Sequence, residues 1–272
     1  METIHKEYLE NGYYIIKNAI SKDVCDNIIN EIEKIKTNIK IPFTNVQFGY
    51  GNLIHHEIAK NLIQNNTVMD FLKYFYKGGF CCNHLFIHNK SKWVGPGIEW
   101  HQEIFNKKTF HPTVEDMSDN EIINNFMQVY VPLQHQDIEN GGLRIIPKGH
   151  KLGRLKCYDT LNIQLNHKRA ILPSELDRAY SKCGIMNLDL NPGDVLFFNH
   201  LLPHSSSSNV GPNDRKAMVM LTFKTTDGMN DEVLIQEKKY RRNFVIKSLG
   251  EKIEQMTSVK KFYSSDSILK IA

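Results

Sequence analysis

Residues 100 to 103 read Trp100-His101-Gln102-Glu103, and this stretch decides how the rest of the chain is interpreted. Side chains of an extended backbone alternate between two faces, so His101 and Glu103 point to the same side of a strand. An imidazole and a carboxylate on one face can hold a metal ion together. A His-x-Glu pair is weak evidence by itself, because the same spacing also occurs on ordinary protein surfaces.

The third ligand has to come from elsewhere, and His204 is the best candidate. It follows the apolar run Val195-Leu196-Phe197-Phe198, which predicts a buried strand that ends at Asn199. Two histidines and one carboxylate form the facial triad of non-heme iron(II) oxygenases, which leaves three adjacent coordination positions open. We therefore predict His101, Glu103 and His204 as the metal ligands and the catalytic centre.

Other motifs follow in a fixed order along the chain: Glu139-Asn140-Gly141-Gly142-Leu143-Arg144-Ile145-Ile146-Pro147-Lys148-Gly149-His150, then Pro192-Gly193-Asp194-Val195-Leu196-Phe197-Phe198, then His204-Ser205-Ser206 with Arg215. Together with the first stretch, this series resembles the phytanoyl-CoA dioxygenase family of iron(II)- and 2-oxoglutarate-dependent oxygenases. The resemblance covers roughly residues 5 to 225. Most members carry Asp where this chain has Glu103, which offers the same ligand chemistry with one more methylene. Halogenating relatives have Ala or Gly there, so Glu103 argues against halogenation.

The resemblance implies a set of residues for the co-substrate 2-oxoglutarate. The matching Arg, Arg215, forms a bidentate ion pair with the distal carboxylate, for which its planar fork is suited, and the matching Ser, Ser206, adds a hydrogen bond. Tyr130 and Gln128, on one face of a predicted strand, are expected in the same pocket, although both could instead only satisfy a neighbouring strand. His84 and His88 could contact a ligand or be ordinary buried histidines: the sequence leaves both readings open.

The function implied is that of an enzyme that uses Fe(II) and takes 2-oxoglutarate and O2 as co-substrates. Such an oxygenase converts 2-oxoglutarate to succinate and carbon dioxide and oxidises a second substrate by attack on a C–H bond. Hydroxylation is the default outcome, and desaturation or cyclisation starts with the same step. We expect a small-molecule metabolite or natural-product intermediate as substrate. The alternatives are a cupin-like metalloenzyme that does not use 2-oxoglutarate and a non-catalytic binding module with a relic site.

Composition limits the class of protein. The chain has 272 residues, of which 41% are apolar and 24% charged, as in an ordinary globular protein. Its formal net charge of +4 is too small to indicate a nucleic-acid partner. Five cysteines without a paired framework, no secretory N-terminus and no apolar run of about 18 residues predict a cytoplasmic protein without a membrane anchor. The oligomeric state is not indicated.

Apolar periodicity and turn residues predict the local elements. Helices are expected over 22–37 with Ser21 as N-cap, 66–76, 119–125, 174–183 and 245–256, and strands over 12–16, 80–90 and 126–133. Asn140 and Gly141 predict a hairpin turn into a strand that begins at Leu143. Asn191-Pro192-Gly193-Asp194 predicts a turn between paired strands over 188–198.

Short strands with Gly and Pro turns, preceded by helices, predict a mainly β fold with flanking helices. The expected core is a double-stranded β-helix of the jelly-roll, cupin-like kind, with the helices against one of its sheets. We expect a single dioxygenase domain over residues 1–272, with its core at about 5–225 and a C-terminal helical tail at about 226–272. The metal would then lie between the two sheets.

Overall fold

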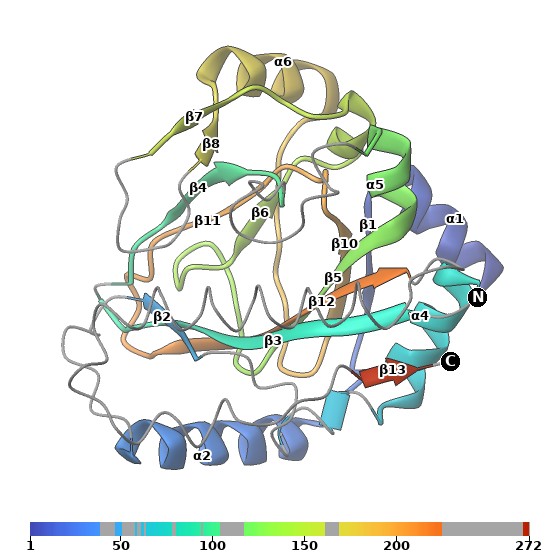
Figure 1. Ribbon diagram of the computed structural model, residues 1–272. Helices are drawn as coiled ribbons and strands as arrows, with labels where there is room; N and C mark the ends of the chain where they lie inside the picture. Colours follow the sequence, from blue (N-terminus) through green and yellow to red (C-terminus); the bar gives the residue numbers. More distant parts are fainter. Residues whose placement is uncertain are drawn as a thin grey trace, which may run out of the picture.

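The computed structural model describes residues 1–38, 47–50, 58, 61–62, 64–77, 80–93, 95–103, 117–160, 169–224 and 269–271. These residues form mainly antiparallel β-sheet with a few helices, which confirms the predicted fold class (Figure 1). The helix predicted over 245–256, and nearly all of the tail predicted over 226–272, lie outside the described residues.

The larger sheet has seven strands in the order β1-β10-β5-β12-β3-β13, with β2 also paired to β3. Its strands are β1 (Tyr13–Ile16), β2 (Gln47–Tyr50), β3 (Phe80–Lys90), β5 (Phe126–Pro132), β10 (Val195–Asn199), β12 (Arg215–Lys224) and β13 (Leu269–Ile271). The smaller sheet has four strands in the order β4-β11-β6-β9. They are β4 (Ile98–His101), β6 (Leu143–Ile145), β9 (Met186–Asn187) and β11 (His204–Ser206), and β7 (Cys157–Asp159) pairs separately with β8 (Arg169–Ile171).

Helices cover the outer sides of this arrangement. They are α1 (Glu2–Asn11), α2 (Lys22–Asn38), α4 (Asn66–Tyr76), α5 (Asp119–Asn125) and α6 (Pro173–Cys183), with a short 3-10 helix η1 (Gly149–Leu152). In Figure 1, α2 lies below the larger sheet and α6 lies above the smaller one. Among the residues that the structure describes, no helix combines the length and the apolar character needed to cross a membrane.

Capping residues fix where the two helices against the larger sheet begin. The Ser21 hydroxyl accepts a hydrogen bond from the Val24 N–H at 3.4 Å, at the start of α2. The Asn65 side chain accepts one from the Val68 N–H at 3.0 Å, and α4 ends where Lys77 turns into the left-handed region with φ 46°. The helices predicted over 22–37 and 66–76 are therefore confirmed.

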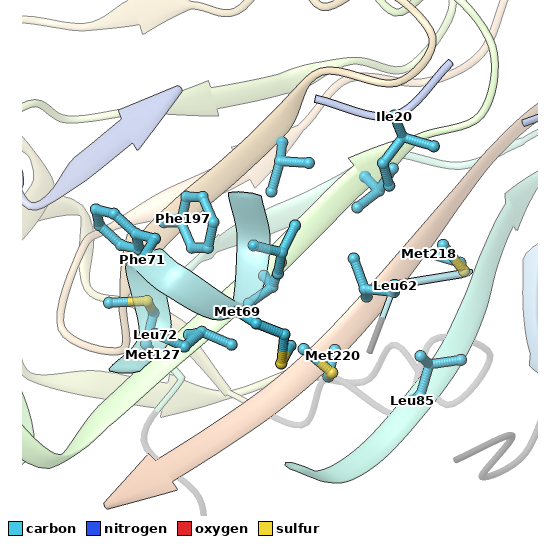
Figure 2. Close-up of a cluster of buried hydrophobic side chains, with 14 of the residues drawn as sticks. Ile20, Leu62, Met69, Phe71, Leu72, Leu85, Met127, Phe197, Met218 and Met220 are labelled. Atoms are coloured by element: carbon cyan, nitrogen blue, oxygen red, sulfur yellow. The ribbon is translucent and has the colours of Figure 1, made fainter. Parts of the chain in front are cut away.

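The main hydrophobic core lies between these helices and the larger sheet. Figure 2 shows Phe71 of α4 against Phe197 of β10, with ring centroids 4.1 Å apart. Alternate residues of β5 enter this core, among them Met127, Val129 and Val131. Tyr130 points the other way, into a second cluster shared with the smaller sheet. The alternation of side chains along β5 thus separates a side that faces the helices from a side that faces the smaller sheet.

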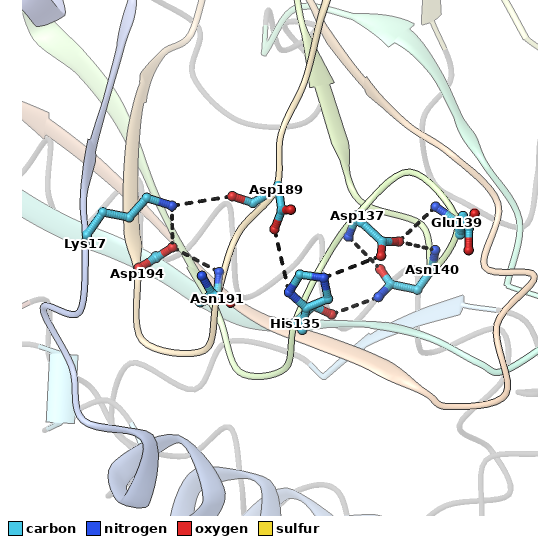
Figure 3. A network of polar contacts seen from close by, with 8 residues as sticks. All are labelled: Lys17, His135, Asp137, Glu139, Asn140, Asp189, Asn191 and Asp194. Atoms are coloured by element: carbon cyan, nitrogen blue, oxygen red, sulfur yellow. Dashed lines mark hydrogen bonds and ion pairs between the residues drawn. The ribbon is translucent and has the colours of Figure 1, made fainter.

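The hairpin predicted at Asn140-Gly141 is wrong. Strand β5 pairs with β10 and β12, whereas β6 pairs with β11 and β9, so the turn passes from one sheet to the other. Gly141 does adopt a positive φ of 90°. Asp137 shapes the turn, because its carboxylate accepts hydrogen bonds from the backbone N–H groups of Glu139 and Asn140 (Figure 3).

The paired strands predicted over 188–198 are also wrong, although the turn between them exists. Only β10 is a strand of the sheet, and Leu190 makes one isolated bridge, to Gln136. The buried Asp194 instead directs this turn toward β1. Its carboxylate accepts hydrogen bonds from Lys17 at 2.8 Å and from the Asn191 N–H at 2.9 Å (Figure 3).

Gly193 of this turn provides a test of the packing. It has φ 83°, and a Cβ there would lie 1.9 Å from the backbone oxygen of Ile20. Gly184, after α6, has φ 71° but open space around it, so it serves as a matched control. Gly184→Ala should cost only the backbone strain at φ 71° and ψ −176°, about 1 to 3 kcal/mol, because this conformation strongly favours glycine. Gly193→Ala should lower the free energy of unfolding by about 2 to 5 kcal/mol, since the backbone must also move. Urea unfolding of both variants measures the difference, and equal losses would contradict the close contact.

Candidate active site

The smaller sheet brings together the three residues predicted as metal ligands. His101 is the last residue of β4, Glu103 lies two residues beyond it, and His204 begins β11 directly opposite His101. All three side chains are buried, and their ligand atoms lie within 4.8 Å of one another. Glu103 is not part of the strand: its backbone N–H donates to the carbonyl of His200 at 2.8 Å, which holds the extended chain in place.

The three side chains converge on one point. The Oε1 atom of Glu103 lies 3.4 Å from Nε2 of His204 and 3.8 Å from Nε2 of His101. The two imidazole rings have centroids 4.1 Å apart. Two ring nitrogens and one carboxylate oxygen thus face a common centre.

Each histidine is oriented through its other ring nitrogen. His101 Nδ1 lies 2.7 Å from the backbone oxygen of Glu99, and His204 Nδ1 lies 3.0 Å from that of Leu202. A carbonyl oxygen only accepts, so each Nδ1 carries the hydrogen and donates it. Both Nε2 atoms are then left with a lone pair directed at the centre, which is the arrangement of metal-bound histidines.

The electrostatics of the cluster favour a charged carboxylate beside the two imidazoles. Burial alone would raise the pKa of Glu103, but hydrogen bonds and charge interactions with His101 and His204 outweigh it and hold the pKa well below its usual range. Burial lowers the pKa of His204, and the neighbouring His101 lowers it further, against the opposing effect of Glu103. A buried anion with two imidazole nitrogen donors fits a divalent cation, which would supply the missing positive charge.

The remaining two residues of the first quoted stretch fix the two ligands in place. The Gln102 amide donates to the carbonyls of Gly153 at 2.9 Å and Leu201 at 2.7 Å. Its oxygen accepts from the Leu155 N–H at 2.9 Å. Trp100 packs into a separate cluster under α6, with the Arg144 guanidinium 5.3 Å from its ring centroid. Successive side chains of this extended stretch alternate between two faces. Trp100 and Gln102 therefore point into the surrounding structure, whereas His101 and Glu103 point toward the centre.

Arg215 lies at the start of β12 and is only 1% exposed. Its Nη1 atom donates to the Tyr130 hydroxyl at 2.5 Å and its Nη2 atom to the Gly141 carbonyl at 2.6 Å. The Tyr130 hydroxyl in turn donates to the side-chain oxygen of Gln136 at 2.6 Å. Nη1 also lies 3.4 Å from Nδ1 of His88. These contacts hold the guanidinium rigidly, while its Nε has no hydrogen-bond partner within the described part of the chain.

Ser206 and Gln128 also face the interior. Ser206 follows His204 by two residues on β11, so both side chains point to the same side of the sheet. Gln128 shares its face of β5 with Tyr130 and pairs across the strands with Phe198, whose ring lies 4.9 Å from that of His204. Gln128 is 5% exposed, and its oxygen has no hydrogen-bond partner in the described ranges. The side chain of His84 lies outside the described residues, so its two readings stay open.

The sequence did not single out three buried residues that complete the site. Lys90 donates to the Ser206 hydroxyl at 2.8 Å, Gln136 orients Tyr130, and the backbone of His200 holds Glu103. Burial lowers the pKa of His200 to about 4, so its ring is neutral at physiological pH. Lys90 and His200 act through contacts between residues far apart in the chain, whereas Gln136 contacts Tyr130, six residues away. The sequence neighbours of Lys90 and Gln136 are largely polar, so no local pattern marks these two residues as buried.

Comparison with known proteins places this site in context. The profile of the family described as Phytanoyl-CoA dioxygenase (PhyH) matches residues 8–217. Among curated proteins, the peroxisomal phytanoyl-CoA dioxygenase of Bos taurus is 25% identical over 229 residues, which are 78% of this chain. The match spans 65% of the bovine protein's length.

Solved structures share the fold at low sequence identity. The epimerase SnoN, in complex with Fe3+, alpha-ketoglutarate and a nogalamycin compound, superposes with a TM-score of 0.64 at 14% identity, over 83% of this chain and 84% of that one. The alpha-ketoglutarate-dependent carbocyclase SnoK from nogalamycin biosynthesis superposes with a TM-score of 0.62 at 14% identity, over 87% and 90% of the two chains. Both likenesses support the jelly-roll architecture described above.

The converging ligand set predicts how the chain binds iron(II). His101→Ala and His204→Ala should each weaken binding by more than about a hundredfold, because changes to residues that only orient a ligand already cost about 10- to 100-fold. His135→Ala is the matched control, since this histidine is on the surface with its side chain 48% exposed. Anaerobic equilibrium dialysis, followed by elemental analysis, measures the bound iron. Iron retained at wild-type affinity in either of the first two variants would exclude these ligands.

Proposed function

The chain belongs to the phytanoyl-CoA dioxygenase family, and we propose that it is an Fe(II)- and 2-oxoglutarate-dependent dioxygenase that oxidises a small-molecule metabolite or natural-product intermediate. One observation carries this proposal: the buried convergence of His101, Glu103 and His204, on the same interior that holds the buried guanidinium of Arg215. The first group fits a divalent metal, and the second fits a carboxylate.

Bound iron and 2-oxoglutarate would supply the oxidation chemistry, with O2 as oxidant and succinate and carbon dioxide as products. The chain's own residues supply binding and orientation. His101, Glu103 and His204 would hold the metal on one side and leave the other side to ligands. The Nδ1 hydrogen bonds to backbone carbonyls keep both imidazoles in the required tautomer.

Arg215 would bind the distal carboxylate of 2-oxoglutarate. Its contacts with Tyr130 and Gly141 use one N–H of each terminal nitrogen and hold the guanidinium plane in a fixed orientation before any ligand arrives. Preorganisation of this kind reduces the entropy lost on binding. Ser206, on the same face as His204, would add a hydrogen bond between the metal and the guanidinium, and Tyr130 would line the pocket through its ring. Gln128 would lie at the end near the metal.

A polar substrate of modest size fits these side chains better than a long acyl chain. The interior offers Gln128 with an unsatisfied oxygen near Phe198 and His204, and such a group can accept a hydrogen bond from a hydroxyl or amine. The structural neighbours include an epimerase and a carbocyclase, so cyclisation stays within the proposed range beside hydroxylation and desaturation. The cytoplasmic location remains a prediction from the sequence.

Succinate formation tests the proposed function. The purified protein, loaded with iron(II), should produce succinate from 2-oxoglutarate in the presence of oxygen, and a library of candidate metabolites should contain one that raises this rate. A cupin-like enzyme of another class would bind iron without consuming 2-oxoglutarate. A relic binding module would form no succinate with any metabolite. Either result would overturn the proposal.

Arg215→Ala tests the proposed carboxylate contact. Removal of one partner of a buried, hydrogen-bonded charge pair typically costs about 2 to 5 kcal/mol, so the KM for 2-oxoglutarate should rise on the order of thirtyfold or more. Arg215→Lys should recover only part, because an ammonium cannot form two parallel hydrogen bonds. Iron affinity should stay near the wild-type value in both variants.

Arg178→Ala is the control for the loss of a positive charge, because Arg178 lies on α6 with its side chain 43% exposed. It should leave the KM unchanged. An unchanged dependence on 2-oxoglutarate in Arg215→Ala would mean that the co-substrate is bound elsewhere or is a different molecule.

A further inference from the structure

Lys90, the last residue of β3, has an environment that is unusual for a lysine. It is 0% exposed, and its side chain passes two glycines. A Cβ at Gly95 would lie 2.8 Å from Cβ of Lys90, and a Cβ at Gly141 would lie 2.7 Å from its Cδ. Any larger residue at either position would collide with the lysine. The glycines of the two neighbouring turns therefore leave a path for this side chain into the interior.

The path ends at the loop that follows the metal ligand His204. Lys90 Nζ donates to the Ser206 hydroxyl at 2.8 Å and to the Ser207 carbonyl. Asn209 fixes the lysine from the backbone side, since its amide donates to the Lys90 carbonyl at 3.0 Å. An ammonium has three N–H groups, and the described contacts use two of them. One N–H remains for a ligand.

Among the residues that the structure describes, no acidic side chain balances this charge. Lys90 pairs across the strands with Arg215, and both are almost completely buried. Within the described ranges, neither has a carboxylate at ion-pair distance, and Glu103 is held by the two histidines. Burial and the charges of Arg215 and Arg144 lower the pKa of Lys90 to about 6, so without an anion its amine is mostly neutral at pH 7, and a bound anion would raise this pKa and favour the charged ammonium. Two adjacent buried cations without an anion are costly, and a bound anion would remove much of that cost.

We propose that Lys90 is a positioning residue for 2-oxoglutarate: it fixes Ser206 as a hydrogen-bond donor to the distal carboxylate and places a second positive charge beside Arg215. This inference rests on the proposed function and deepens it. Because Lys90 donates to the Ser206 oxygen, the single hydroxyl hydrogen of Ser206 is directed elsewhere, toward the pocket. A carboxylate with four lone-pair positions can accept from both Ser206 and Arg215.

The spacing of the strand agrees with this role. Ser206 lies two residues beyond His204, which is roughly 7 Å along a strand. The two carboxylates of 2-oxoglutarate stand at opposite ends of a five-carbon chain. One end can therefore reach the metal ligands while the other reaches Ser206, Lys90 and Arg215.

The test compares two 2-oxo acids on the protein loaded with Zn(II), which binds the same ligands without turnover. 2-Oxopentanoate has the carbon chain of 2-oxoglutarate but ends in a methyl group in place of the distal carboxylate. Isothermal titration calorimetry gives the Kd of each acid for the wild type and for Lys90→Met. We expect Lys90→Met to raise the Kd of 2-oxoglutarate about tenfold or more and to change the Kd of 2-oxopentanoate by less than about twofold.

Matched variants separate charge from structure. Lys92→Met removes the same charge two residues away at an exposed position and should change neither Kd. Lys90→Gln keeps an N–H donor and removes the charge, so it tests the proposal if Lys90→Met is poorly folded. Lys90→Met should reduce the affinity for 2-oxoglutarate less in a Ser206→Ala background than in the wild type. The reason is that part of the effect of Lys90 depends on the Ser206 hydroxyl.

The outcomes are distinct. If the wild type does not bind 2-oxoglutarate, the proposed function itself fails. If the wild type binds it and both Lys90 variants bind it equally well, only the role of Lys90 is overturned. Equal weakening of 2-oxoglutarate and 2-oxopentanoate would assign Lys90 a structural role and would also overturn the proposal.

Discussion

The need to pair buried polar groups is the constraint on which this structure depends. A charge or an unpaired donor inside an apolar barrel costs several kcal/mol, so such groups remain only where other groups or ligands satisfy them. The interior contains two such sets: a carboxylate between two imidazoles, and a guanidinium beside an ammonium. Within the described residues, the first set has no cation beside it and the second has no anion. The proposed metal ion and dicarboxylate would complete both.

Several features of the turns follow from this constraint. The carbonyl of Gly141 accepts a hydrogen bond from Arg215, and the missing side chain leaves space for Lys90. This glycine of the Glu139-Asn140-Gly141 turn therefore contacts both basic side chains. Asp137 and Asn140 close the turn by reciprocal side-chain contacts with backbone N–H groups (Figure 3). The motif is therefore architectural, as the sequence suggests, but it shapes the wall of a charged pocket and not a hairpin.

Local rules explain what the sequence could predict. The period of two in β5, the Ser21 cap of α2 and the His-x-Glu spacing depend on neighbouring residues, and each is found in the structure. The hairpins at 139–142 and 188–198 were wrong because a turn signal shows that the chain reverses, not which strand it then joins. Lys90 was missed because its partner Ser206 lies 116 residues away along the chain, and Gln136 was missed because no local rule predicts its contact with Tyr130, although that residue is only six positions away.

The two sheets divide the site between them. The proposed metal ligands belong to β4, the segment after it and β11 of the smaller sheet, whereas Arg215, Tyr130 and Lys90 belong to β12, β5 and β3 of the larger one (Figure 1). The Lys90 to Ser206 hydrogen bond connects the sheets at this point. The distance between the proposed metal ligands and the cationic pair Lys90 and Arg215 therefore depends on how the two sheets pack against each other. No single strand determines that packing. A buried lysine that joins the sheets beside the pocket couples the packing of the barrel to the length of the ligand that it accepts.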